Sequence, residues 1–228
     1  MKISVWEQLQ KEMTWAQIGN INGKKILDFG SGNGMTACHY AQNNEVVAVE
    51  PDEDVIKERF KENNYIQLCG SIDKLSEFED NYFDIILCHN VLEYAEFREE
   101  IVKEFARLLK KDGILSILKH NLPGRVMQMV VLLNNFDHAN ELLDGKSGNA
   151  EKYGTINYYD DEDLLKWTKG LVIDKVLGQR TFWDLQQNQE MQGEKEWQKK
   201  MLTIESRVAE IEEYKAIAFF HHIILRKI

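Results

Sequence analysis

Short apolar runs alternate with turn signals between residues 25 and 121, and this rhythm restricts the folds open to the chain. Each run is almost continuously apolar, as strands are when a parallel sheet buries both of their faces. Helical segments separate the runs, so successive strands are joined by right-handed crossovers. We therefore predict an α/β fold. The runs read "KILDFG", "EVVAVE", "YIQLCG", "FDIILCHN" and "GILSILKHN".

The segments between these runs carry helix signals. Residues 34–43 form the first predicted helix, and residues 51–64 form the second, with Pro51 and three acids at its start, where the helix dipole favours them. The clearest helix is predicted within residues 95–113. Its apolar residues fall on one face, its lysines gather at its end, and Gly113 is expected to stop it.

The rhythm changes after residue 121. Residues 121–160 begin at a proline-glycine break, carry one apolar helix around Met127–Leu133, and continue as polar, glycine-containing sequence. This pattern predicts a helical lid inserted over the sheet. The alternation then resumes with a helix at 161–169, a strand near 171–184, a charged helix at about 194–214 and a final strand from 216 to 228.

Length and composition agree with one domain. A chain of 228 residues, 43% hydrophobic and 29% charged, suits a single globular α/β domain. We expect residues 1–228 to form a Rossmann-like, seven-stranded, mostly parallel sheet, with helices on both faces and one antiparallel edge strand. No apolar run approaches the length of a membrane span, and the N-terminus lacks the features of a signal peptide, so we expect a cytoplasmic protein without membrane contact.

The cysteines and the net charge exclude some functions. Cys38, Cys69 and Cys88 are far apart and odd in number, which favours reduced thiols over disulfides. Neither the Cys38-His39 pair nor the Cys88-His89 pair has a second ligand at the usual spacing, so we predict no metal site. The net charge of −10 gives no general attraction to nucleic acid.

A glycine-rich turn, "GSGNG", follows the first predicted strand. Gly30, Gly32 and Gly34 allow the backbone to approach a ligand closely. Ligands of open α/β sheets bind outside the carboxyl ends of the strands, which is where this turn lies. A nicotinamide-binding domain has a similar turn followed by an acid about 20 residues on, and Glu50 would be that acid here.

Three details favour S-adenosylmethionine over a dinucleotide. The glycines form G-x-G-x-G, which misses the third glycine of the dinucleotide pattern. Asp28, immediately before the turn, suits an ammonium group better than a pyrophosphate. "GSI" at residues 70–72 and "CHNVLEY" at residues 88–94 follow the next strands, where they could flank an adenine and close over a methyl group.

Together, "LDFGSGNG", "VEP", "CGSIDKL", "FDIILCHNVLEY" and "LLKKDGILSI" resemble the ordered motifs of class I S-adenosylmethionine-dependent methyltransferases. The resemblance implies that the glycine turn borders the methionine moiety, that Glu50 takes both ribose hydroxyls and that Ser71 and Ile72 flank the adenine. Taken singly, Asp28 also suits a turn cap, Glu50 a solvated helix cap and His89 a hydrogen-bonded strand end. The predicted cofactor site comprises Asp28, Gly30, Ser31, Gly32, Glu50, Pro51, Ser71, Ile72 and His89.

A narrower resemblance extends over most of the chain. "HNVLEY", "NNFDHA", "QRTFWDL", "LTIESR" and "FFHHIILRK" are similar, in this order, to motifs of the bacterial tRNA methyltransferases that esterify 5-carboxymethoxyuridine at the wobble position. Three features depart from that family. The family's lysine-rich run is missing, since residues 121–160 hold three basic and five acidic residues, a net charge of −2. Gln10 stands where the family has an arginine. Trp183 replaces a histidine, while Arg180, Phe182 and Asp184 are retained.

The acceptor determines which groups the reaction needs. A carboxylate acceptor needs no base, whereas an alcohol or amine does, for which His89, His120 and Glu93 are candidates, although Glu93 fits better as a helix-start residue. Arg180 is the candidate cation for a carboxylate acceptor, because its fork can bind one bidentately. A small-molecule O- or N-methyltransferase, with Met127–Leu133 as its lid, and a non-catalytic binder of S-adenosylmethionine are the alternatives.

Overall fold

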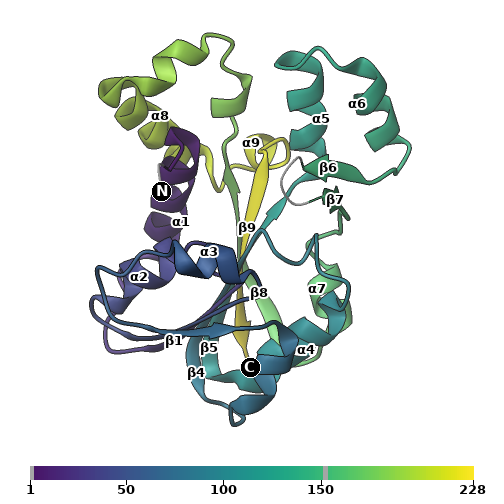
Figure 1. The fold of residues 1–228 in the computed structure, drawn as a ribbon. Coiled ribbons are helices and arrows are strands. Elements are labelled where there is room, and N and C mark those ends of the chain that lie inside the picture. The colour runs from purple at the N-terminus through teal and green to yellow at the C-terminus, as the bar shows by residue number, and fades with distance from the viewer. Residues whose placement is uncertain (1–2, 151–153) are drawn as a thin grey trace. The chain divides into compact units, whose positions relative to one another are not determined.

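The computed structural model describes residues 3–150 and 154–228, which contain one seven-stranded sheet and one two-stranded sheet (Figure 1). The strand order of the larger sheet is β3-β2-β1-β4-β5-β9-β8. The antiparallel strand β9 lies between β5 and the edge strand β8. The predicted Rossmann-like, mostly parallel seven-stranded sheet is therefore confirmed.

The chain divides into two compact units. The first unit comprises Met1–Gly19, Leu118–Tyr158 and Val176–His222; the second comprises Asn20–Ile117, Tyr159–Lys175 and Ile223–Ile228. Three strands contribute residues to both: β5 (Leu109–His120), β8 (Leu171–Gln179) and β9 (Phe220–Lys227). A single domain with a lid at about residues 121–160 stays a prediction.

The second unit is built around β1, which pairs in parallel with β2 and β4. Leu27 and Ile86 are fully buried neighbours in this register, as the continuous apolar runs predicted. The elements of this unit are β1 (Lys25–Phe29), α2 (Met35–Ala41), β2 (Glu45–Glu50), α3 (Glu53–Lys57), β3 (Ile66–Cys69), the 3-10 helix η1 (Ile72–Glu77), β4 (Phe83–His89), α4 (Arg98–Leu108) and α7 (Asp163–Trp167).

The helices of this unit are shorter than predicted, and α3 and α4 differ most from their predicted bounds. α3 begins after its N-cap Asp52 and ends at Lys57, because the chain then turns back and Phe60 N–H donates to Asn33 O at 2.9 Å. α4 ends at Leu108 and β5 begins at the next residue. Gly113 therefore lies inside β5 instead of ending the helix.

The first unit contains the N-terminal helix, both helices of the predicted insertion and most of the C-terminal region. α1 and α6 were not predicted, and the predicted helix at 194–214 is divided into α8 and α9. Its elements are α1 (Val5–Ile18), α5 (Leu122–Val131), α6 (Phe136–Leu143), β6 (Gly148–Ala150), β7 (Gly154–Ile156), the 3-10 helices η2 (Trp183–Leu185) and η3 (Gln189–Gly193), α8 (Lys195–Val208) and α9 (Glu212–Lys215).

The predicted apolar helix of the insertion is α5, which packs against α6 beside the β6–β7 hairpin (Figure 1). Met129 of α5 and Ala139 and Leu142 of α6 form a small buried cluster. Both helices are too short to be stable alone, and burial of these apolar groups stabilises them. Packing thus accounts for Met129, whereas Val130 and Val131 at the end of α5 are exposed.

The start of α5 is fixed to the segment between α9 and β9. Asn121 Nδ2 donates to Ala216 O at 3.0 Å and to Ala218 O at 2.8 Å, and its backbone N–H donates to Phe219 O at 3.0 Å. Gly124 lies against the same backbone, where a Cβ would stand 2.1 Å from Ala218 O. Only glycine fits this contact without displacing main chain.

We expect Gly124→Ala to lower the free energy of unfolding by about 1–3 kcal/mol, because its methyl group would overlap the Ala218 carbonyl. Urea denaturation of the whole chain measures the change. Gly193→Ala is the control, since nothing lies within 4 Å of the corresponding Cβ position and the φ of Gly193 is not in the left-handed region. Equal losses in the two variants would contradict the proposed close contact.

Candidate functional site

The four parallel strands of the second unit end at one edge of the sheet. Phe29, the last residue of β1, lies beside Val49 and Cys88 in the register, and Glu50 lies beside Cys69. The segments that follow therefore begin from neighbouring strand ends. β1 carries Asp28 and leads to Gly30, Ser31 and Gly32; β2 ends at Glu50, before Pro51; β3 leads to Ser71 and Ile72; and β4 ends at His89.

The three glycines of the turn have positive φ angles but different surroundings. A Cβ at Gly30 would lie 2.3 Å from Val91 Cγ2, and one at Gly34 would lie 2.1 Å from Tyr65 Oη. No described atom outside its chain neighbours lies within 4 Å of the Cβ position of Gly32. The turn is therefore open at Gly32, where its backbone can approach a ligand.

Glu50 ends β2 as a nearly buried carboxylate, 9% exposed. Its Oε2 accepts from Gly32 N–H at 2.7 Å, and its Oε1 accepts from Asp52 N–H at 3.1 Å. A carboxylate has about four acceptor positions, so each oxygen can accept one more hydrogen bond. The carboxylate is thus fixed beside the open part of the turn, in a position to bind a diol.

Some buried polar atoms at this edge have no hydrogen-bond partner among residues 3–150 and 154–228. Two of them are Ser31 Oγ, in the glycine turn, and Asn90 Oδ1, directly after β4. Buried polar atoms are almost always hydrogen-bonded in folded proteins, to protein, water or ligand. Both atoms are therefore available to polar groups of a ligand or to ordered water.

Asp28 lies in β1 just before the turn and is 3% exposed. Burial raises the pKa of the Tyr40 hydroxyl, and the negative charge of Asp28 raises it further. Burial also raises the pKa of the Cys88 thiol, to which the charges of Glu93 and Asp28 contribute. Buried negative charge at this edge favours a cationic ligand group over a pyrophosphate.

The turn after β3 is held by two hydrogen bonds that backbone N–H groups donate. Gly70 N–H donates to Glu50 O at 3.1 Å, and Ser71 N–H donates to Asp73 Oδ1 at 2.8 Å. Ile72 then begins η1. The predicted adenine-flanking residues thus start from the strand end next to Glu50.

His89 is buried and bonded within the sheet. Its Nε2 lies 2.8 Å from Oγ of Ser116, which is completely buried on β5. This contact supports the interpretation of His89 as a hydrogen-bonded strand end, since Nε2 is already engaged. Sequence analysis missed Ser116 because a serine inside an apolar strand gives no sign of its partner.

The other two candidate bases occupy different surroundings. Glu93 lies in the loop before α4, which begins only at Arg98, so it is not the expected helix-start residue. It is 1% exposed, and its charge contributes, after burial, to the raised pKa of the Tyr159 hydroxyl. His120, in the first unit, contacts the rings of Phe219 and Phe220 at centroid distances of 5.5 Å and 4.7 Å.

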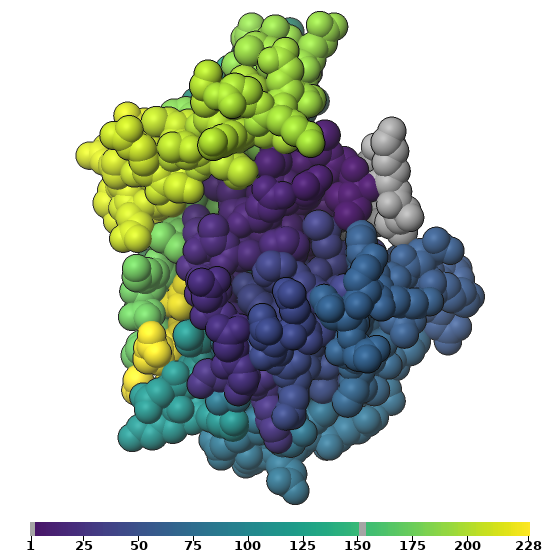
Figure 2. Space-filling view, turned by 90° about the vertical axis from the view of Figure 1, so that its left-hand side faces the viewer, coloured from purple at the N-terminus to yellow at the C-terminus, as the bar shows by residue number. Residues whose placement is uncertain are grey.

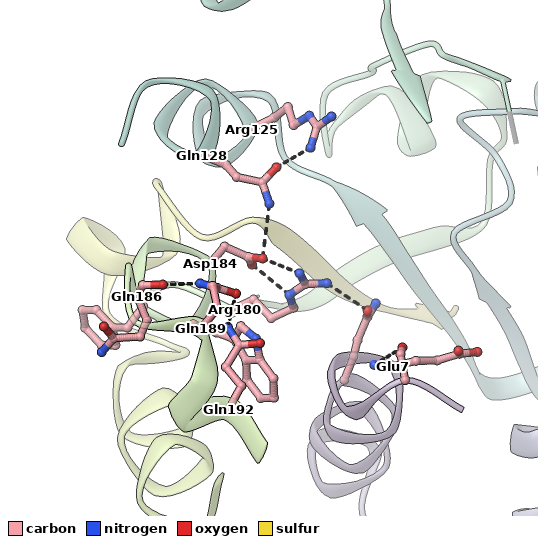
Figure 3. A network of polar contacts seen from close by, with 12 residues as sticks. Glu7, Arg125, Gln128, Arg180, Asp184, Gln186, Gln189 and Gln192 are labelled. Atoms are coloured by element: carbon pink, nitrogen blue, oxygen red, sulfur yellow. Dashed lines mark hydrogen bonds and ion pairs between the residues drawn. The ribbon is translucent and has the colours of Figure 1, made fainter. Parts of the chain in front are cut away.

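Arg180 follows β8 directly and forms a buried ion pair (Figure 3). Its Nε donates to Asp184 Oδ2 at 2.8 Å and its Nη2 donates to Asp184 Oδ1, while Nη1 faces Gln10 Oε1 at 3.4 Å. The strand ends at Gln179 instead of residue 184, because Arg180 has a φ of 59° and leaves the extended conformation. That Arg180 binds an acceptor stays a prediction.

Aromatic rings and a second arginine extend this ion pair. The Arg180 guanidinium lies over the ring of Phe219 at 4.9 Å, the shortest of its three ring contacts. Gln128 of α5 donates through Nε2 to Asp184 Oδ1 at 3.2 Å and accepts from Arg125 Nη1 (Figure 3). The first unit thus holds two arginines joined through one glutamine and one aspartate.

Glu205 of α8 fixes the backbone that carries this ion pair. Its carboxylate is completely buried and accepts from the N–H groups of Thr181 at 2.8 Å, Phe182 at 2.8 Å and Trp183 at 3.1 Å. Burial raises the pKa of Glu205, and the three hydrogen bonds oppose that rise. Trp183, which replaces the family's histidine, packs edge-on against Trp197 of α8 at 5.5 Å.

A chain of buried polar side chains connects α1 with β8 and β9. Thr14 donates to Gln10 O at 2.8 Å, and Gln179 Nε2 donates to Thr14 Oγ1 at 3.1 Å and to Gln17 Oε1 at 2.6 Å. The same oxygen of Gln17 lies 2.8 Å from His222 Nδ1. Burial lowers the pKa of His222 to about 3, so the imidazole is neutral.

The described residues hold no group of His, Cys, Asp and Glu side chains arranged to bind a metal ion. No helix within residues 3–150 and 154–228 is long and apolar enough to cross a membrane.

Comparisons with known proteins identify a methyltransferase domain within the second unit. Residues 27–117, all in the second unit, match a family model described as "Methyltransferase domain". A solved S-adenosylmethionine-dependent methyltransferase from Mesorhizobium loti has a similar fold, with a TM-score of 0.60 and 12% sequence identity over 98% of this chain and 100% of that chain. At such identity the likeness shows the fold alone.

Two curated relatives differ in how much of the chain they match. A ubiquinone biosynthesis O-methyltransferase of Glaesserella parasuis is 25% identical over 64% of this chain and 63% of its own length. The tRNA 5-carboxymethoxyuridine methyltransferase of Escherichia coli K12 is 24% identical over 96% of this chain and 88% of its own length. The second likeness therefore includes the segments of the first unit.

We expect acid to destabilise the protein through His222. Its pKa is 6.5 in a model peptide and about 3 here, so between these values the unfolded state binds a proton that the folded state does not. The free energy of unfolding should therefore fall by about 2 kcal/mol from about pH 7.5 to about pH 5. His222→Gln should remove this part of the pH dependence in urea titrations at the two pH values.

His138→Gln makes the same chemical change on α6, where His138 contacts Glu141 near the surface, and serves as the control. The pH dependence of the control should follow that of the wild type. An unchanged pH dependence in His222→Gln would show that His222 is not held neutral.

Proposed function

We propose that this chain, a class I S-adenosylmethionine-dependent methyltransferase, forms a methyl ester on the carboxylate of a modified wobble uridine in tRNA. The observation that carries the proposal is the extent of the likeness to the tRNA 5-carboxymethoxyuridine methyltransferase, 96% of this chain. That extent includes α5, β8 and α8, which lie outside the matched methyltransferase domain. The likeness to the ubiquinone O-methyltransferase covers 64%.

The residues at the carboxyl edge fit S-adenosylmethionine, the methyl donor. Glu50 has the acceptor capacity to receive two ribose hydroxyls, and its fixed position beside Gly32 orients it for this role. We assign the methionine moiety to Gly30, Ser31 and Gly32, because the turn is open at Gly32 and Ser31 Oγ can bond a polar group of the ligand. Asp28 supplies the charge that favours the ammonium group.

The adenine is assigned to the turn after β3. Ser71 and Ile72 begin from the strand end next to Glu50, and Pro51 follows Glu50 itself. A ring that lies between these segments would be connected to a ribose at Glu50. The positions of these residues along one sheet edge support the assignment.

The bound cofactor supplies a methyl group on a sulfonium, which is already electrophilic. The chain must align the acceptor with that methyl group, because alignment is the main part of such catalysis. A carboxylate is ionised at neutral pH and needs no base. The engaged Nε2 of His89 agrees with this, and we assign His89 a positioning role through Ser116.

Arg180 is the proposed cation for the acceptor carboxylate. Its Nε and Nη2 hold Asp184, while Nη1 makes only the long contact with Gln10. A carboxylate that displaced the Gln10 side chain would reach Nη1 without breaking the ion pair. The rings around Arg180 exclude water and would strengthen such a contact.

A small-molecule O- or N-methyltransferase is the second candidate. The net charge of −10 for the chain and −2 for residues 121–160 favours it, since tRNA binding needs clustered cations. In that case a hydroxyl or amine acceptor would require a general base.

We expect Glu50→Ala to weaken binding of S-adenosylhomocysteine by about 1.5–3 kcal/mol, or roughly 10- to 150-fold, through lost hydrogen bonds to a charged group. Isothermal titration calorimetry measures the change. Glu50→Gln keeps the shape of the side chain and should show a smaller loss. Glu45→Ala, at the exposed opposite end of the same strand, is the control and should bind as the wild type does. Wild-type affinity in Glu50→Ala would remove Glu50 from the site.

We expect the single-turnover rate to be flat from about pH 6 to 9, because a carboxylic acid with a pKa near 4 is ionised throughout this range. His89→Asn should then cost on the order of tenfold, the loss of a positioning residue, instead of the 10²–10⁴-fold loss of a general base. The methylated product should hydrolyse in mild base, as esters do. A base-stable product, or a rate that rises tenfold per pH unit near neutrality, would move the proposal to the second candidate.

A further inference from the structure

One side of α8 is cationic although the chain as a whole is acidic. The helix contains four basic and two acidic residues, in a chain with a net charge of −10. All four basic residues are exposed, whereas one of the two acids, Glu205, is buried on the opposite side. The exposed side thus keeps a net positive charge. Its basic residues are Lys195, Lys199, Lys200 and Arg207.

Most of these cations are not neutralised by neighbouring acids. Lys200 lies 3.5 Å from Glu196, and both side chains are more than 70% exposed, so water screens the pair. Lys199 and Arg207 form no ion pair with any described residue. On other helices a lysine has an acid at close range, as Lys166 has Asp163 at 2.6 Å.

The surface over these residues is hollowed and accessible. A shallow groove of about 280 Å³ is lined by Glu196, Lys199, Lys200, Thr203, Ile204 and Arg207. Figure 2 shows α8, in yellow-green, on the face toward the viewer and beside the purple α1. From Lys195 to Arg207 the helix extends about 18 Å, enough for several backbone phosphates.

We propose that this cationic face of α8 binds the phosphodiester backbone of the tRNA acceptor, an inference that rests on the function proposed above. Charge complementarity selects this occupant: the face offers several lysine and arginine side chains to a polyanion, and the rest of the acidic chain repels one. The cationic face of α8 also supplies the positive charges that residues 121–160 lack.

The buried side of α8 relates this face to the Arg180 loop. Glu205 holds the backbone of Thr181, Phe182 and Trp183, which lies between Arg180 and Asp184. The exposed basic residues and the buried carboxylate of Glu205 thus belong to the same helix. Docking of the tRNA backbone on α8 therefore sets its distance from the loop that carries the proposed acceptor cation.

The double variant Lys199→Glu, Arg207→Glu tests the inference. Its control is Lys103→Glu, Lys111→Glu, which makes the same charge change at exposed positions of α4 and β5. Fluorescence anisotropy with unfractionated bacterial tRNA at several salt concentrations measures binding. We expect the α8 variant to bind at least tenfold more weakly and to lose about 2 from the salt slope, while the control stays within about threefold of the wild type.

Methyl transfer separates this inference from the proposed function. If both hold, the α8 variant should show a raised KM for tRNA carrying 5-carboxymethoxyuridine, and wild-type rates with the free nucleoside. If the wild type methylates neither substrate, the proposed function fails, whereas the binding assay still decides whether α8 contacts tRNA. Equal tRNA binding by the α8 variant and the control overturns the inference. The inference is also overturned if the wild-type protein binds vesicles containing anionic phosphatidylglycerol and does not bind tRNA.

Discussion

Parallel pairing of β1 with β2 and β4 is the constraint on which the second unit depends. It brings the carboxyl ends of neighbouring strands together, and it leaves backbone groups beyond each strand end without a sheet partner. The chain satisfies some of them locally: Gly30 N–H and Ser31 N–H both donate to Val49 O. Gly32 N–H instead donates to the side chain of Glu50. The edge proposed to bind a ligand is therefore the edge where the sheet stops supplying hydrogen-bond partners.

Each of the two units has a buried carboxylate that accepts hydrogen bonds from backbone N–H groups of a loop. Glu50 accepts from the N–H groups of Gly32 and Asp52, and Glu205 accepts from three consecutive N–H groups. Burial of a carboxylate is costly, and multiple backbone hydrogen bonds offset that cost. In both places a single side chain determines the conformation of a loop. The two differ in that Glu50 keeps acceptor capacity beside an open turn.

The strands and the carboxyl edge could be predicted because their signals are local. A buried parallel strand is a continuous apolar run, and the residues after it are at its end by definition. α1 was missed because its buried polar residues find partners far along the chain, as Thr14 does with Gln179. The prediction that Gly113 ends a helix was wrong, because lysines followed by a glycine also occur within strands, as they do in β5.

The same distinction between local signals and distant contacts applies to the residues of the site. The presence of Arg180 and Asp184 was recognised from the sequence motifs, although a strand near 171–184 would have placed the two about 13 Å apart. The role of Glu205 was not recognised, because it binds main-chain N–H groups, which every residue except proline has. For the same reason the end of β8 at Gln179 could not be predicted: the chain leaves the sheet to meet a carboxylate on a different helix.

The contact of Asn121 and Gly124 with the segment before β9 restricts how relatives of this chain can vary in length. Only Asn121 lies between β5 and α5, and the junction is fixed by three hydrogen bonds and a close backbone approach. An insertion there would move Asn121 away from its acceptors. At the exposed turn after α6, the described hydrogen bonds of Gly145 and Lys146 are made to α6 itself, so this turn can lengthen at little cost. Family members with a larger insertion should therefore extend it beyond α6 and keep the β5–α5 junction at constant length.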